Sequence, residues 1–241
     1  MFVVAREAAL AAAKASEARW RMHQPVSALD GVPVTIKENI YTKGDPAPIG
    51  TKANDDAAPQ PADAPPAARL REAGCVILGK TTMPDFGMLS SGLSSIHGVT
   101  RNPWNTSRNT SGSSSGAGAA AAAGYAPLHL GTDIGGSVRL PAGWCGIFTL
   151  KPSLGRIPIY PPYAGRVAGP MTRTVADSAA MMAVLSRADT RDTMSLPWQD
   201  IAWNKLESDP KARRIGLMMD AGWGLGVTAD VAAAVHAAAR V

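Results

Sequence analysis

Residues 131–156, GTDIGGSVRLPAGWCGIFTLKPSLGR, form the most informative stretch of this chain. The apolar segment Pro127–Leu130 precedes it, and the glycine-rich turn Thr132–Ser137 follows Gly131 directly. A second glycine-rich segment, Ser111–Gly118, runs straight into an alanine-rich helix expected at 119–123. Apolar strands and helices that alternate through such turns are typical of layered folds, so the sequence predicts an α/β protein.

The flanking segments continue this alternation. Residues 4–22 predict an alanine-rich helix, and the segment VPVTIK at 32–37 alternates as a strand does. Residues typical of helix ends predict helices at 63–73, 174–185 and 228–241. Short apolar runs predict strands at 75–78 and 215–219. The last helix is expected to be still running at Val241.

Composition excludes several classes of protein. The chain has 241 residues, of which 46% are hydrophobic and 18% charged, so it can build a core and is not a disordered chain. It has no apolar run long enough to span a membrane, and Arg6 and Glu7 interrupt the start where a signal peptide needs an apolar stretch. We therefore expect a cytoplasmic protein without membrane contact.

The charged and metal-binding residue types point to no ligand. The net charge is +5, but the basic residues are spread along the chain, so nucleic-acid binding is not expected from charge. Cys75 and Cys145 lie in apolar segments and are expected to be buried thiols. The four histidines show no i, i+4 pair. Neither a metal nor a cofactor is predicted.

Two short motif matches fail on physical grounds. Residues 74–81, GCVILGKT, fit the P-loop pattern, but CVIL is a strand sequence and cannot form the flexible phosphate nest. Residues 112–116, GSSSG, match the nucleophile elbow of α/β-hydrolases, yet the preceding RNPWNTSRNT is polar where an elbow needs an apolar strand. Neither a nucleotide site nor a nucleophile elbow is expected.

Three segments in order carry a more specific signal: PVTIKEN at 33–39, GSSSGAGAAAAAG at 112–124, and residues 131–156. With these, the chain resembles the amidase signature family of serine hydrolases from about Ser27 to about Asp192. Glu38 stands where the family more usually has aspartate. The resemblance implies a layered α/β/α fold with a mixed central sheet, of which this chain would hold an incomplete, N-terminal portion.

This interpretation makes residues 1–241 a single domain truncated at the C-terminus. It comprises an N-terminal helix (1–24), the catalytic core motifs (27–192), and a strand followed by an unfinished helix (213–241). A half-built sheet would leave an unpaired edge and an exposed apolar face. We therefore expect association through that face, as a homo-oligomer for example.

The resemblance also implies the catalytic residues. Lys37 would be the general base, Ser113 the bridging serine on a cis peptide bond, and Ser137 the nucleophile that forms an acyl-enzyme. Successive backbone N–H groups up to that of Ser137 would stabilise the oxyanion. The other site residues would be Ile134, Gly135, Gly136 and Ser114 in the oxyanion hole and substrate site, with Asp133 and Arg139 supporting the loop.

The chemistry sets one requirement for Lys37. A lysine accepts a proton from a serine only when it is neutral, so burial must lower its pKa far below about 10.4. Taken alone, Lys37 would be a solvated lysine at a strand end and Ser137 an ordinary turn serine. Only the joint pattern favours catalysis.

We predict an amidohydrolase that cleaves the C–N bond of a small carboxamide and releases ammonia or an amine, with no nucleic-acid partner. One alternative is the amidase subunit of a tRNA-dependent amidotransferase, which would use the same residues. Another is a fragment without independent catalytic function. The identity of the amide stays open.

Overall fold

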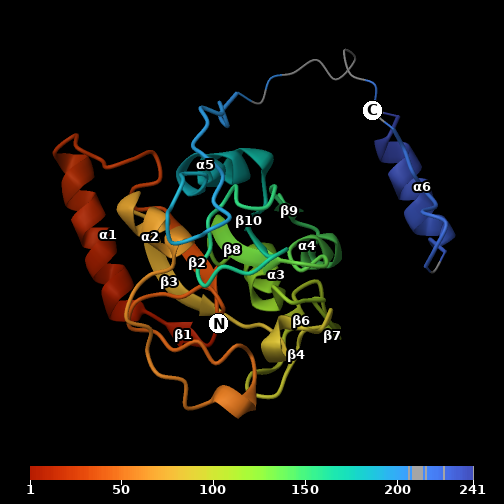
Figure 1. Cartoon of the computed structure of the whole chain (residues 1–241), viewed down its shortest axis with the longest axis horizontal. Coiled ribbons are helices and arrows are strands. Elements are labelled where there is room, and N and C mark those ends of the chain that lie inside the picture. Colours follow the sequence, from red (N-terminus) through yellow and green to blue (C-terminus); the bar gives the residue numbers. More distant parts are fainter. Residues whose placement is uncertain (206, 208–213, 215, 225, 241) are drawn as a thin grey trace. The chain divides into compact units, whose positions relative to one another are not determined.

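The computed structural model in Figure 1 describes residues 1–205, 207, 214, 216–224 and 226–240. The helices are α1 (Arg6–Arg21), α2 (Pro65–Glu72), α3 (Ser115–Ala122), α4 (Arg139–Cys145), α5 (Val175–Leu185) and α6 (Ala229–Ala238), with the short 3-10 turns η1 (Lys52–Asn54) and η2 (Asp85–Gly87). The strands are β1 (Val3–Val4), β2 (Pro33–Lys37), β3 (Val76–Thr81), β4 (Leu93–Ser94), β5 (Gly98–Val99), β6 (Arg101–Asn102), β7 (Asn105–Asn109), β8 (Leu128–Asp133), β9 (Phe148–Thr149) and β10 (Val167–Thr172).

Within the described residues the main sheet has six strands in the order β1-β3-β2-β8-β10-β9. Strand β2 is parallel to both of its neighbours, β3 and β8, whereas the other pairings are antiparallel. Parallel neighbours end at the same edge of a sheet. Lys37 at the end of β2 and Asp133 at the end of β8 therefore lie at one edge.

Alternate residues of the strands face two different helix layers, because side chains of a strand point to opposite faces in turn. Val34 and Ile36 are fully buried in the larger apolar core, together with residues of α2 and α5. On the other face, Ala117 of α3 packs with Met171 of β10. The mixed sheet between two helix layers confirms the predicted α/β/α class (Figure 1).

Most of the predicted elements are present. The helices expected at 4–22, 63–73 and 174–185 are α1, α2 and α5, and the strand expected at 32–37 is β2. Thr174 caps α5 by accepting a hydrogen bond from the Asp177 N–H. Strand β3 runs further than the predicted segment 75–78, because β2 continues beside it to the pair Lys37 and Thr81. The rejected P-loop match thus lies on a strand.

Two predictions near the C-terminus are wrong. Residues 216–219 form no strand, and among the described residues no segment pairs with them; Ile215 lies outside the described residues. A strand is stable only with a hydrogen-bonded neighbour. Helix α6 ends at Ala238, where the Arg240 N–H bonds to the Ala237 carbonyl and closes the last turn. Val241 lies outside the described residues.

The chain separates into two compact units, Met1–Lys205 and Leu206–Val241. All the predicted site residues belong to the first unit. The assignment of the whole chain to a single domain stays a prediction. None of the described helices combines the length and the apolar character needed to cross a membrane.

Candidate active site

Lys37 is fully buried at the C-terminal end of β2, on the strand face that looks toward α3. Its Nζ lies 2.8 Å from Ser113 Oγ, 3.0 Å from Ser114 Oγ and 3.0 Å from Thr132 Oγ1. Two hydroxyls come from the loop before α3 and the third from β8. The structure therefore surrounds the amine with three hydroxyl groups.

The protonation state of Lys37 follows from this burial. Loss of water around an ammonium disfavours the charged form, and here it lowers the pKa of Lys37 to about 7. The positive charge of Arg166 also lowers this pKa, whereas the negative charges of Asp133 and Glu38 oppose the shift. A large fraction of Lys37 is neutral at physiological pH and able to accept a proton.

The loop between β7 and α3 brings Ser113 and Ser114 above the amine. The peptide bond from Gly112 to Ser113 is cis. A side chain on Gly112 would lie 2.4 Å from the Ser91 carbonyl oxygen, so only glycine fits this close approach. The Ser114 N–H donates to the Ser137 carbonyl oxygen at 3.1 Å. This bond joins the loop to the segment that carries the predicted nucleophile.

Asp133 organises the turn between β8 and α4. Its carboxylate accepts hydrogen bonds from the N–H groups of Gly136 (2.9 Å) and Val138 (3.0 Å) and from both Nε and Nη2 of Arg139. Burial works to raise the pKa of Asp133, but these hydrogen bonds outweigh it and hold the pKa at about 2. Asp133 stays ionised and its hydrogen bonds fix the turn, whereas a supporting role in catalysis for it and Arg139 stays a prediction.

Ser137 lies in this turn, half-buried, and it lines the same cavity of about 260 Å³ as Ser113. Lys37 lies behind Ser113, outside the cavity lining. Among the four N–H groups expected to meet an oxyanion, that of Gly136 is already bonded to Asp133. An oxyanion would therefore have to compete with the Asp133 carboxylate for the Gly136 N–H, and the oxyanion role of Gly136 stays a prediction. The groups of Ile134, Gly135 and Ser137 remain candidates.

Other groups with catalytic potential lie away from this cavity. His129 is buried in β8, where its Nδ1 contacts Thr35 Oγ1 at 2.7 Å and its Nε2 contacts the Ala126 carbonyl. Burial lowers its pKa to about 4, so it is a neutral core residue. Cys75 and Cys145 are both buried, and burial raises the pKa of each thiol, as a structural role requires.

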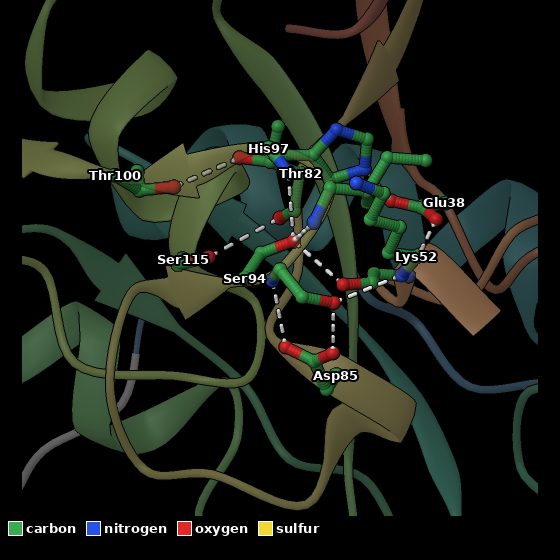
Figure 2. Close-up of polar contacts among 11 residues, drawn as sticks. Glu38, Lys52, Thr82, Asp85, Ser94, His97, Thr100 and Ser115 are labelled. Carbon is green, nitrogen blue, oxygen red and sulfur yellow. Dashed lines mark hydrogen bonds and ion pairs between the residues drawn. The ribbon is translucent and has the colours of Figure 1, made fainter. Parts of the chain in front are cut away.

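A closed ring of polar contacts that the sequence did not predict lies beside the site, and Figure 2 labels Glu38, Ser94 and His97 within it. Glu38 Oε1 accepts from the Gly50 N–H (2.6 Å), and the Gly50 carbonyl accepts from Ser94 Oγ (2.6 Å). Ser94 Oγ accepts from the His97 N–H (3.0 Å), and His97 Nε2 returns to Glu38 Oε2 at 2.7 Å. The adjacent Ile49 lines the cavity, so this ring supports a cavity wall.

Replacement of Glu38 with alanine should destabilise the fold. Glu38 is fully buried, so the change leaves the Gly50 N–H and the His97 ring without their acceptor, and each loss costs roughly 1–3 kcal/mol. Urea unfolding of Glu38→Ala measures this effect. Glu17→Ala is the control, because the exposed Glu17–Arg21 pair contributes at most about 0.5 kcal/mol. Equal stability of the two variants would refute a supporting role for Glu38.

Comparison with known proteins fixes the family. The family model described as Amidase matches residues 1–241. The chain belongs to the amidase family. It is 42% identical over 220 residues to a glutamyl-tRNA(Gln) amidotransferase subunit of Chloroflexus aggregans, and 44% identical over 211 residues to the protein of the same name in Methanococcoides burtonii. These alignments cover 88% and 86% of this chain and 44% of each relative.

Solved structures of the amidase family share the fold. A bacterial aryl acylamidase of the amidase signature enzymes superposes with a TM-score of 0.75 and 35% sequence identity. The match covers 81% of this chain and 42% of that protein. The family resemblance and the fold class are thereby confirmed, and so is the assignment to a family of amide-cleaving enzymes. The chain spans about 44% of the length of the two curated relatives.

The names of these relatives correct the expectation about partners. For the leading amidohydrolase interpretation we predicted a small-molecule amide substrate and no nucleic acid, with association between copies of this chain. This prediction was wrong, because the relatives are subunits of an enzyme whose name includes a charged tRNA. This chain lacks a basic run, which was the reason to expect no nucleic-acid partner. Such a run reports on direct contact between one chain and nucleic acid, and it says nothing about assembly with other subunits.

Proposed function

We propose that this chain supplies the catalytic residues for cleavage of a carboxamide, through an acyl-enzyme on Ser137 with Ser113 as the bridging serine and Lys37 as the base. One observation carries the proposal: a buried lysine with a pKa of about 7 lies 2.8 Å from Ser113, which opens into the same cavity as Ser137. A lysine of this kind meets the requirement for activating a serine hydroxyl.

The hydrogen bonds around Lys37 support a direction for the relay. Ser114 Oγ donates its hydrogen to the Thr132 carbonyl at 3.0 Å, so toward Lys37 it can only accept. Thr132 Oγ1 also lies near Lys37, at 3.0 Å, and can accept the second N–H of the neutral amine. A neutral amine has two N–H donors and one lone pair. With both donors used, the lone pair is left for the Ser113 hydroxyl.

The proton transfers of the proposed reaction need no base other than Lys37. The Ser137 hydroxyl gives its proton to Ser113 as Ser113 gives its own to Lys37, and Ser137 Oγ attacks the amide carbonyl. The protonated Lys37 side chain then returns this proton through Ser113 to the leaving nitrogen, and the C–N bond breaks. Water then gives its proton to Ser113 and attacks the acyl-enzyme, and the acid is released from Ser137. The N–H groups of Ile134, Gly135 and Ser137 would stabilise the oxyanion.

At a finer level we propose that this chemistry serves a tRNA-dependent amidotransferase, in which this chain is the amidase subunit, with the released ammonia passed to an acceptor held by partner subunits. The support is the identity of 42% and 44% to glutamyl-tRNA(Gln) amidotransferase subunits from two organisms. Copurification tests this assignment. We expect partner subunits to copurify with the natural protein and glutaminase activity to depend on them.

A stand-alone amidase is the second candidate, because the aryl acylamidase matches 81% of this chain at a TM-score of 0.75. Both candidates use the same three residues, so only the partners and the acceptor separate them. Full turnover of simple amides by the isolated natural protein, without partner subunits, would favour this second candidate.

Labelling by a serine-directed fluorophosphonate tests the proposed chemistry. We expect one covalent adduct on the folded natural protein, and mass spectrometry of its peptides should locate it on Ser137. Ser113 and Ser114 should stay unlabelled, because both residues are buried and the hydroxyl of each is hydrogen-bonded to Lys37, whereas Ser137 is half-buried. A folded sample without an adduct on Ser137 would refute the acyl-enzyme.

A further inference from the structure

Asn39 lies in the turn that follows β2, two residues after Lys37. The residue is half-buried and lines the candidate active-site cavity together with Ser113, Thr132 and Ser137. The relay described above uses these three hydroxyl residues and gives Asn39 no role. Its amide is therefore a polar group of the cavity that the proposed chemistry leaves unexplained.

The amide of Asn39 contacts the Thr132 hydroxyl with both of its polar atoms. Its Nδ2 lies 3.1 Å from Thr132 Oγ1, and its Oδ1 lies 3.4 Å from the same oxygen. Thr132 Oγ1 in turn lies 3.0 Å from Nζ of Lys37. A single hydroxyl group thus connects the amide of Asn39 to the amine of Lys37.

The direction of the Thr132 hydroxyl hydrogen decides what this oxygen does to Lys37. A threonine hydroxyl has one hydrogen to donate, and its oxygen can accept others. When the hydrogen points to Asn39 Oδ1, the oxygen accepts an N–H of Lys37. When it points to Lys37, it occupies the single lone pair of the neutral amine. Ser113 needs that lone pair to pass its proton on, so the two directions have opposite effects on the relay.

The other two hydroxyls around Lys37 have their hydrogens assigned already. The Ser114 hydroxyl donates to the Thr132 carbonyl at 3.0 Å, so toward Lys37 it accepts. The hydrogen of Ser113 is the one that the relay transfers. Only the Thr132 hydroxyl needs a further group to fix its direction, and Asn39 Oδ1 is an acceptor within its reach.

We propose that Asn39 is a positioning residue that accepts the hydroxyl hydrogen of Thr132 and thereby keeps the lone pair of Lys37 directed at Ser113. The inference rests on the proposed function, because it concerns the same lysine and the same proton path. No covalent bond changes at Asn39 or at Thr132. The contribution is that of one hydrogen bond between neutral groups, which corresponds to a factor of roughly 2 to 12 in rate.

The pH dependence of Ser137 labelling by the fluorophosphonate tests this inference in the natural protein, with its copurifying subunits. In Asn39→Leu we expect the labelling rate at the alkaline plateau to fall roughly 2- to 12-fold. The acidic limb near pH 7 should also move to lower pH. The Thr132 hydrogen has lost its acceptor at position 39 and now stabilises the neutral form of Lys37, which lowers the pKa of the lysine. A loss of folded protein would lower the rate without moving the limb.

Asn39→Asp is the conservative variant that should restore the plateau rate, because a carboxylate also accepts the Thr132 hydrogen. Its negative charge favours the protonated form of Lys37, so the limb should move to higher pH. Three other charged groups act on Lys37 and stay in place in both variants: Arg166, Asp133 and Glu38. Shifts of the limb in opposite directions therefore report on position 39.

A double-mutant cycle with Thr132→Val shows whether Asn39 acts through Thr132. Valine removes the hydroxyl, so Asn39→Leu should change neither the plateau rate nor the limb any further in that background. An equal fall in both backgrounds would overturn the proposal, and so would an Asn39→Leu variant with the wild-type rate and limb. Asn204→Leu changes an exposed asparagine and is the control, which should keep both. If the leucine variant fails to fold, Asn39→Ala provides the same comparison.

Kinetics on glutamine separate positioning from direct contact with a substrate, since Asn39 also lines the cavity. A positioning role lowers kcat of the glutaminase activity and leaves KM nearly unchanged. A raised KM with unchanged labelling would mean that Asn39 binds the substrate, and would overturn the proposal. A wild-type protein without label on Ser137 would refute the acyl-enzyme together with this inference, whereas equal labelling of the wild type and Asn39→Leu would refute the inference alone.

Discussion

Replacement of Lys37 with methionine is expected to lower kcat by about 10²–10⁴-fold, the usual contribution of a general base. Methionine fills the buried space next to Ser113 but has no lone pair that can take its proton. Steady-state kinetics on an amide that the wild-type protein cleaves measures the loss. Fluorophosphonate labelling of Ser137 should slow in parallel, because both reactions need an activated hydroxyl.

The pH profile adds a signature that a change in folding would not produce. The pKa of Lys37 is lowered to about 7, so the lysine becomes neutral as the pH rises through that value. In the wild-type protein kcat/KM should therefore rise with pH through an acidic limb near 7. In Lys37→Met this limb should be absent, because the group that titrates has been removed.

Lys80 offers a matched control for these measurements. It is also fully buried, its pKa is lowered by burial to about 8, and its Nζ donates to the Ile40 carbonyl instead of a serine. Lys80→Met therefore removes a comparable buried amine without touching the relay. It should keep the pH limb, and a loss of turnover as large as that of Lys37→Met would contradict the assignment of Lys37 as the base.

The strand periodicity of β2 made part of this site predictable. Val34 and Ile36 point into the apolar core, so Lys37 had to point to the other face. Its burial could not be predicted from that pattern. Two of the hydroxyls that enclose the amine belong to Ser113 in the loop before α3 and to Thr132 in β8. These residues follow Lys37 in the sequence by 76 and 95 positions. Only the family resemblance brought these segments together before the structure did.

The polar ring around Glu38, in contrast, could not be predicted from the sequence. Its contact with His97 joins residues 59 positions apart, and neither residue lies in a periodic segment that would indicate burial. Asn39 was missed for a similar reason, because an asparagine in a turn after a strand is usually solvated. The roles of such groups can be identified only after the fold shows which side chains they contact.

Replacement of Ser113 with alanine is the second change with a large expected effect. Among the described serines, Ser113 alone both contacts Lys37 and lines the cavity with Ser137. Without it the proton path is broken, so kcat should fall by about 10²–10⁴-fold while the folded state stays nearly as stable as the wild type. Steady-state kinetics and urea unfolding of the same preparation measure both quantities.

Ser114→Ala separates catalysis from structure at the neighbouring position. Ser114 Oγ accepts from the Thr132 N–H (3.2 Å), donates to the Thr132 carbonyl (3.0 Å) and contacts Lys37, but it does not line the cavity. Its loss leaves a buried N–H without an acceptor and should cost roughly 1–3 kcal/mol of stability, with a smaller loss of kcat than Ser113→Ala. The reverse order of effects, with Ser114→Ala the more inactive and Ser113→Ala the less stable, would mean that the proton passes through Ser114 and that the lone pair of Lys37 points there.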